Sequence, residues 1–186
     1  EVGVFELEAR PLVAIVEREA PGISLRGLPL TTRDPRQLLT TQDVDVAVGH
    51  FPAAIAAVSI EELQPDAAAA FGHRRLYSSH YACVMRRDHP LARSELTLDA
   101  YCAAHHLLVS VSGRPHGHVD ETLAALGRSR RIVLTVNQFF TAGIVVAISD
   151  LLTALPRHFL ASTGTTDKVA VRQLPMELPT VDIEAL

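Results

Sequence analysis

Apolar and polar positions along the chain repeat with two different periods. Apolar residues three to four positions apart predict helices, and short alternating or continuous apolar runs predict strands. The predicted helices cover residues 4–16, 35–39, 98–102, 119–126 and 139–148. The predicted strands cover residues 23–28, 44–49, 73–77, 81–87, 107–111, 131–136, 151–155, 169–174 and 181–183. Because helices and strands alternate, the pattern predicts an α/β protein with a mostly parallel sheet.

Proline, glycine and capping residues set the expected ends of several elements. Pro21-Gly22 ends the first helix, Asp34-Pro35 begins the second, Thr97 caps the third and Gly127 ends the fourth. Residues 50–72 are rich in alanine, contain two prolines and show little period, so they are predicted as a long connection. Long connections in compact domains are often functional.

Length and composition indicate a folded protein of one large domain or two small lobes. The chain has 186 residues, of which 48% are hydrophobic and 20% charged. Its only cysteines, Cys83 and Cys102, exclude a disulfide framework. The longest apolar run, residues 142–148, is too short to cross a membrane, and the first residues do not resemble a signal peptide. We therefore expect a cytoplasmic protein with no membrane partner.

Charge is distributed unevenly along the chain. Residues 1–66 carry eleven acids and five arginines, whereas residues 74–131 carry nine arginines and five acids. The arginines come as separated doublets, and a phosphate-tracking surface gathers many more cations on one face. The chain itself is therefore not expected to bind DNA.

Nine histidines raise the alternatives of a metal site or an enzyme. His105-His106 and His116-Gly117-His118 are the densest groups, but no cysteine or carboxylate stands at zinc-ligand spacing. Ser110 or Cys83 could pair with the loop histidines in a hydrolase, yet no nucleophile-elbow motif is present. The chain also lacks dinucleotide-binding and phosphate-loop glycine motifs. The sequence therefore predicts no metal, no cofactor and no catalysis.

Five segments, in order, carry a resemblance to a known family. They are Asp43–Gly49, Arg86–Ala92, Val119–Gly127, Leu134–Val136 with Phe139, and Ser149–Pro156. Together they resemble the effector-binding domain of LysR-type transcriptional regulators. Phe71–Tyr77 and His116–Asp120 are similar to stretches found in regulators of aromatic-compound catabolism.

The resemblance implies a fold like that of type II periplasmic binding proteins, with two Rossmann-like lobes joined by two crossover strands. Lobe I would comprise residues 1–83 and 157–186, and lobe II residues 84–156. The crossovers would lie near residues 81–86 and 155–159. The family's N-terminal winged helix-turn-helix has no counterpart in this chain, so DNA would be bound only through that missing domain.

The resemblance also implies a small organic effector, such as an aromatic carboxylate, in the cleft between the lobes. Ser110 and the loop to His116 would hold the polar end of the effector near a helix N-terminus. Gln138 would give a directional hydrogen bond at a position where the aromatic-responsive branch often has histidine. The expected effector-binding residues are His50, Phe51, Phe71, Ser110, His116, Gln138 and Phe139. The expected assembly is a homodimer or homotetramer, and the alternatives are a transporter's solute-binding protein and a histidine-dependent hydrolase.

Overall fold

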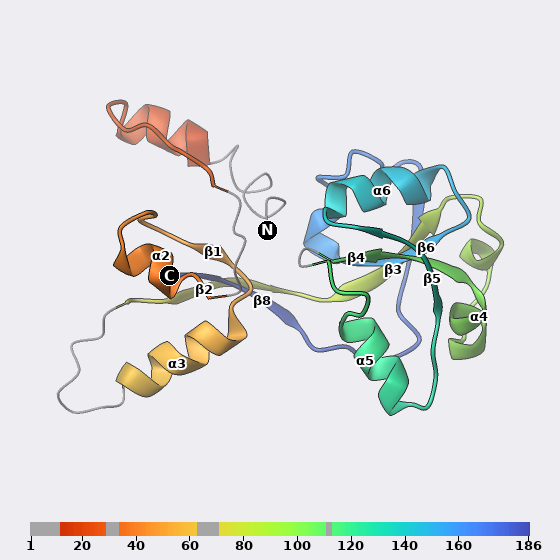
Figure 1. Cartoon of the computed structure of the whole chain (residues 1–186). Helices are drawn as coiled ribbons and strands as arrows, with labels where there is room; N and C mark the ends of the chain where they lie inside the picture. The colour runs from red at the N-terminus through yellow and green to blue at the C-terminus, as the bar shows by residue number, and fades with distance from the viewer. Residues whose placement is uncertain (1–11, 29–33, 63–70, 111–112) are drawn as a thin grey trace. The chain divides into compact units, whose positions relative to one another are not determined.

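The computed structural model describes residues 12–28, 34–62, 71–110 and 113–186. The chain divides into two compact units, drawn in Figure 1. Unit 1 comprises Glu1–Ser79 and Val181–Leu186, and unit 2 comprises His80–Thr180. The backbone therefore passes between the units twice, after Ser79 and after Thr180. Within the described ranges, no helix has both the length and the apolar character needed to cross a membrane.

Unit 1 contains a three-stranded antiparallel sheet in the order β1-β8-β2. Its strands are β1 (Val48–Gly49), β2 (Arg74–Ser79) and β8 (Val181–Ala185), so the last strand of the chain lies at the centre of the sheet. Its helices are residues 12–19, α2 (Arg36–Thr40) and α3 (Pro52–Glu62).

The core of unit 1 forms where α3 begins. Ala47, Phe51 and Ala54 form one buried apolar cluster. A Cβ added to Gly49 would lie 2.6 Å from the Phe51 ring, so only glycine lets this ring approach the strand so closely. Burial of Phe51 therefore couples the start of α3 to the sheet.

Unit 2 contains a five-stranded mixed sheet in the order β5-β4-β6-β3-β7. The strands are β3 (Tyr81–Arg86), β4 (His105–Val109), β5 (Arg131–Val136), β6 (Leu152–Pro156) and β7 (Val169–Arg172). β4 runs parallel to both β5 and β6, whereas β3 runs antiparallel to β6 and β7. β4, β5 and β6 therefore end at the same edge of the sheet.

Helices cover both faces of the unit 2 sheet (Figure 1). They are α4 (Leu98–Ala103), α5 (His118–Ala125) and α6 (Phe139–Ala147), with short 3-10 turns η1 (Pro90–Arg93) and η2 (Arg157–Phe159). Met85 of β3 packs with residues of α4 and α5, and the adjacent Val84 packs with residues of α6. This alternation gives two apolar cores, one on each face.

Most of the predicted elements are confirmed. The strand at 131–136 has the predicted bounds, and the hydroxyl of Thr97 accepts a hydrogen bond from the Ala100 amide at the start of α4. Gly127 follows α5 with a φ of 66°, a conformation that favours glycine.

Four predictions need correction. Residues 23–28 form no strand, and residues 52–62 form α3 instead of part of a long connection. The strand predicted at 44–49 is reduced to Val48–Gly49, and the expected parallel arrangement holds only within β5-β4-β6. The predicted helix at residues 4–16 lies partly outside the described residues. The lobe boundaries implied by the resemblance stay a prediction.

Candidate functional site

Polar side chains follow the parallel strands of unit 2 at the edge where these strands end. Ser110 follows β4, Gln138 follows β5 by two residues, and His158 follows β6 by two residues. The Ser110 amide donates a hydrogen bond to the Val136 carbonyl oxygen at 2.8 Å, which joins the ends of β4 and β5. We call this place the carboxyl edge. Open α/β sheets bind ligands outside the carboxyl ends of their strands.

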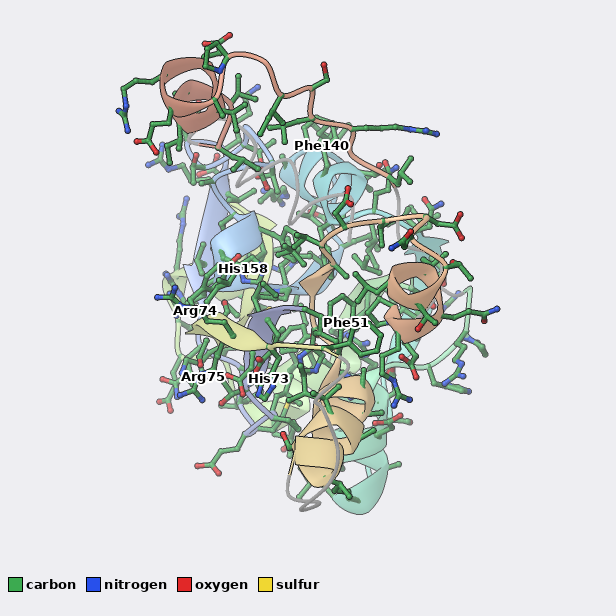
Figure 2. All side chains as sticks on the ribbon, turned by 90° about the vertical axis from the view of Figure 1, so that its left-hand side faces the viewer. Phe51, His73, Arg74, Arg75, Phe140 and His158 are labelled. Atoms are coloured by element: carbon green, nitrogen blue, oxygen red, sulfur yellow. The ribbon has the colours of Figure 1, made fainter. Side chains whose placement is uncertain are left out.

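Three rings contact one another in series beside these polar groups. The Phe139 ring, at the start of α6, stacks on the Phe159 ring with centroids 4.2 Å apart and planes 17° apart. The His158 ring lies 4.2 Å from the same Phe159 ring at 42°. Phe159 is buried, whereas Phe139 and His158 are half-buried. The buried Phe159 ring therefore holds the rings of Phe139 and His158 in place. His158 is labelled in Figure 2.

The N-terminus of α6 also lies at the carboxyl edge. Gln138 is its N-cap residue, but the Gln138 side chain makes no capping hydrogen bond. The first amides of a helix have no partner within the helix and carry a partial positive charge. A carboxylate would be favoured at this place.

His158 is electrically neutral at pH 7. Burial lowers the pKa of its imidazole to about 4. A neutral imidazole offers one donor and one acceptor. The carboxyl edge thus combines a hydroxyl, an amide, a neutral imidazole and the half-buried ring of Phe139.

His116 lies in a different place within unit 2. It is exposed and lines a cavity of about 390 Å³ beside α5. The other residues that line this cavity are Pro115, Asp120, Ala124, Arg128, Ser129, Arg130 and Ile132. None of Ser110, Gln138 and Phe139 lines it. The prediction that His116 holds the polar end of an effector stays a prediction.

A buried polar network holds the loop that contains His116. Asp120 accepts a hydrogen bond from the Gly117 amide at 2.8 Å and pairs with Arg130 through two hydrogen bonds of 2.8 and 3.1 Å. Arg130 also donates to the Tyr101 hydroxyl at 3.1 Å. Burial opposes the charged form of Asp120, but the hydrogen bonds and charge of Arg130 outweigh burial and hold its pKa below the ordinary value. Asp120 thereby satisfies a donor at the start of α5.

The remaining predicted site residues belong to unit 1. The half-buried His50 donates a hydrogen bond from Nδ1 to the Asp182 carbonyl oxygen at 2.9 Å. Phe51, labelled in Figure 2, comes directly before α3 and is completely buried. Phe71 is half-buried, three residues before β2. Their contribution to a ligand site therefore stays a prediction.

Two observations concern the residues named for the enzyme and metal alternatives. Cys83 is fully buried, and burial raises the pKa of its thiol to about 12, so this side chain packs as a small apolar group. Across residues 12–28, 34–62, 71–110 and 113–186, no three histidine, cysteine or carboxylate side chains gather as metal ligands.

The chain forms two units, and the backbone crosses between them twice. Polar groups follow the carboxyl ends of parallel strands in unit 2. These features are typical of two-lobed ligand-binding domains. Residues 9–186 match the family model of the LysR substrate binding domain. The chain belongs to this family.

Known relatives agree with this classification. The chain is 32% identical over 145 residues to the HTH-type transcriptional activator NahR of Pseudomonas putida, a match that covers 78% of this chain and 44% of NahR. The chain thus spans about half the length of the curated relatives it matches. The HTH-type transcriptional activator NagR of Ralstonia sp is 28% identical over 173 residues, a match that covers 93% of this chain and 53% of NagR. Because both relatives are transcriptional activators, the alternative of a transporter's solute-binding protein is not favoured.

Solved structures share the fold. A probable transcriptional regulator, PA0477 of Pseudomonas aeruginosa, has a TM-score of 0.80 at 22% identity and matches 98% of this chain and 58% of its own. The effector binding domain of QuiR has a TM-score of 0.66 at 17% identity, with 98% and 79% covered. The fold class expected from the sequence, two Rossmann-like lobes of the type II periplasmic-binding-protein kind, is confirmed.

Sequence reasoning missed two features of the site. The first is the ring pair of His158 and Phe159, although a strand predicted at 151–155 already indicates that the residues after it reach the carboxyl edge. The second is the Asp120–Arg130 pair, for which the sequence offers no local signal because ten residues and a helix separate the partners.

Proposed function

We propose that this chain is the effector-sensing part of a LysR-type transcriptional regulator and that its ligand is a small ring-bearing organic acid. One observation carries the proposal: Ser110 follows β4, while Gln138 and Phe139 follow the adjacent parallel strand β5, and Gln138 is the N-cap residue of α6. Sites of small ligands combine apolar walls with a few directed polar groups.

Each part of the carboxyl edge suits one part of such a ligand. The Ser110 hydroxyl and the first amides of α6 would receive the carboxylate, and the Gln138 amide would add a directional hydrogen bond. The half-buried ring of Phe139 would pack against the ring of the ligand. The QuiR domain is in complex with shikimate, which supports a cyclic acid as ligand of this fold.

The other proposed ligand contacts come from residues of unit 1. In this proposal His50 and Phe71 contact the ligand, and the buried Phe51 supports His50 from the core. The lobes would be residues 1–83 with 157–186 and residues 84–156. A ligand that binds one placement of the lobes more tightly shifts the protein towards that placement.

The complete regulator would pass this shift to DNA through a segment outside residues 1–186. We propose that the regulator is a homodimer or homotetramer. We also propose that it works in the cytoplasm and has no catalytic activity. Self-association is supported by three exposed apolar residues spaced four positions apart: Phe140 and Ile144 on α6, and Ile148, the C-cap residue of α6.

Thermal unfolding of the chain with a panel of aromatic and aliphatic carboxylates tests the proposed ligand class. A ligand at about a hundredfold excess over its Kd stabilises the folded protein by about 2.7 kcal/mol. We expect Ser110→Ala and Gln138→Ala to weaken the response, and His105→Ala, at the opposite end of β4, to preserve it. A wild-type protein that responds to none of the acids would contradict the proposal.

A further inference from the structure

We infer that unit 2 has a second binding site, separate from the carboxyl edge, for a small organic anion. The site is the cavity of about 390 Å³ that α5 and the start of β5 line, where Arg128 and Arg130 bind the acid group of the ligand. Sites of small ligands have volumes of roughly 300–1,000 Å³. This inference does not depend on the proposed function, because none of Ser110, Gln138 and Phe139 lines the cavity.

The walls of the cavity come from two neighbouring elements of unit 2. Asp120 and Ala124 stand four positions apart and therefore share one face of α5. Residues 128–130 line the cavity from the turn that leads into β5, and Ile132 lines it from β5 itself. Figure 1 shows the chain leaving α5 and turning into β5. The wall formed by β5 therefore belongs to the amino end of this strand, whereas the carboxyl edge lies at its other end.

Arg130 brings a buried charge with unused hydrogen-bond donors to the cavity. Its side chain is only 2% exposed. A guanidinium has five N–H groups, of which two donate to the Asp120 carboxylate and one to the Tyr101 hydroxyl. Among the residues that the structure describes, the remaining two N–H groups have no acceptor. Because a buried donor without an acceptor costs free energy, an oxygen of a bound ligand is favoured here.

The charges around the cavity favour an anion. Two arginines and one carboxylate line it, and this carboxylate, Asp120, already pairs with Arg130 through both of its oxygens. Arg128 pairs with Asp99, whose side chain is 81% exposed. Such surface pairs stabilise a protein little, so the acid group of a ligand can replace Asp99 as the partner of Arg128. Arginine binds both carboxylates and phosphates through parallel N–H donors.

The rest of the lining suits an organic group. Pro115, Ala124 and Ile132 provide apolar surface, and Ser129 adds a hydroxyl group. Sites of small ligands combine such apolar walls with a few directed polar groups. A small ring or alkyl chain that carries an acid group would cover the apolar side chains while the acid group pairs with Arg128. The ligand class is therefore a small organic carboxylate or phosphate.

Titration calorimetry of the full chain with benzoate and with phenyl phosphate tests this inference. The starting protein is the double variant Ser110→Ala/Gln138→Ala, because it lacks the polar side chains of the carboxyl edge. We expect at least one of the two anions to bind this protein. Adding Arg128→Gln should weaken the binding about tenfold or more, since a charge-assisted hydrogen bond is lost. Arg93→Gln is the matched control: it removes an arginine that has an exposed acidic partner but does not line the cavity, and the affinity should stay unchanged.

A second pair of variants fills the cavity. Ala124 and Ala125 are neighbouring exposed residues of α5, but Ala125 does not line the cavity. We expect Ala124→Phe to abolish the binding, because the ring occupies the space of the ligand, and Ala125→Phe to preserve it. Circular dichroism shows whether each variant is folded. If a variant of one pair does not fold, the other pair decides.

Three outcomes would overturn the inference. They are that neither anion binds the starting protein, that Arg128→Gln binds as tightly as Arg93→Gln, or that Ala124→Phe binds as tightly as Ala125→Phe. Inorganic phosphate that binds as tightly as the better of the two organic anions would also overturn it, because the apolar wall would then contribute nothing. The proposed function is unaffected by these outcomes, since every protein in the comparison already lacks the polar side chains of the carboxyl edge.

Discussion

The guanidinium of Arg130 faces the carboxylate of Asp120 with both ends, Nε lying 2.8 Å from Oδ1 and Nη2 lying 3.1 Å from Oδ2. The side chains are 2% and 13% exposed, so this is a buried ion pair. It joins the beginning of β5 to the first turn of α5 and, through the Gly117 amide, to the loop that contains His116. Such geometry fixes the position of α5 on the sheet.

Breaking this pair should destabilise unit 2 strongly. Asp120→Asn leaves the Arg130 charge buried without its counter-charge, a change that costs about 3 kcal/mol or more in the free energy of unfolding. Urea unfolding followed by circular dichroism measures the loss. Asp99→Asn is the matched control, because it removes an exposed partner of Arg128 and should change stability little. Equal stabilities of the two variants would show that the buried pair is not a structural anchor.

Gly143 should not tolerate a side chain. A Cβ added there would lie 2.4 Å from the Thr163 Cγ2 atom, which belongs to a buried residue. Gly143→Ala should therefore cost about 1–3 kcal/mol through overpacking, although alanine favours a helix. Thermal unfolding of Gly143→Ala beside Gly22→Ala, where the new Cβ meets no atom within 4 Å, measures the difference. A Gly143→Ala variant as stable as the wild type would mean that α6 and the Thr163 turn are not in contact.

Stability should fall as the solution becomes acidic. Burial lowers the pKa of His106 from 6.5 to about 4, and the folded protein must therefore keep this ring neutral where the unfolded chain takes up a proton. The contribution is fully present above pH 6.5 and is lost between pH 6.5 and about 4, to an extent of about 3 kcal/mol. His158, whose pKa is also lowered to about 4 by burial, adds to the same slope.

Urea unfolding at a series of pH values measures this slope. His106→Gln keeps an amide donor near the Tyr101 carbonyl oxygen but does not titrate, so its stability should depend less on pH between 4 and 6.5. Combining it with His158→Gln should flatten the curve further. A double variant with the slope of the wild type would assign the pH dependence to other groups.

The two cysteines should differ in reactivity. Cys83 is fully buried with its thiol pKa raised to about 12, whereas Cys102 is partly exposed. Because the thiolate is the reactive species, a thiol reagent at pH 8 should modify Cys102 first and Cys83 only on unfolding. The Cys102→Ser variant is the control. Its one remaining thiol, Cys83, should react very slowly as long as the protein is folded. Fast labelling of Cys83 in that variant would mean that the core around β3 opens readily.

The sequence by itself determined the elements whose signals are local. Residues 131–136 and 139–147 were predicted closely because their periods and flanking residues belong to the same short segments, and Thr97 marked the start of α4 through its own hydroxyl. Ser110 could be named as a candidate because it stands near the end of the strand predicted at 107–111, and Gln138 and Phe139 because they come shortly after the strand predicted at 131–136. The five segments that resemble LysR-type effector-binding domains, in the order of that family, predicted the fold class.

Only the tertiary structure decided the features that depend on distant partners. Residues 52–62 show no clear period, yet they form a helix because Phe51, Ala54 and Val58 are buried in unit 1, whose central strand, β8, comes from the other end of the chain. Residues 23–28 alternate like a strand but have no neighbouring strand to pair with among the described residues. The contacts of Asp120 with Arg130 and of Phe139 with Phe159 likewise join separate elements. A local pattern reports which face of a segment is apolar, but the partner that buries this face is chosen when the whole chain folds.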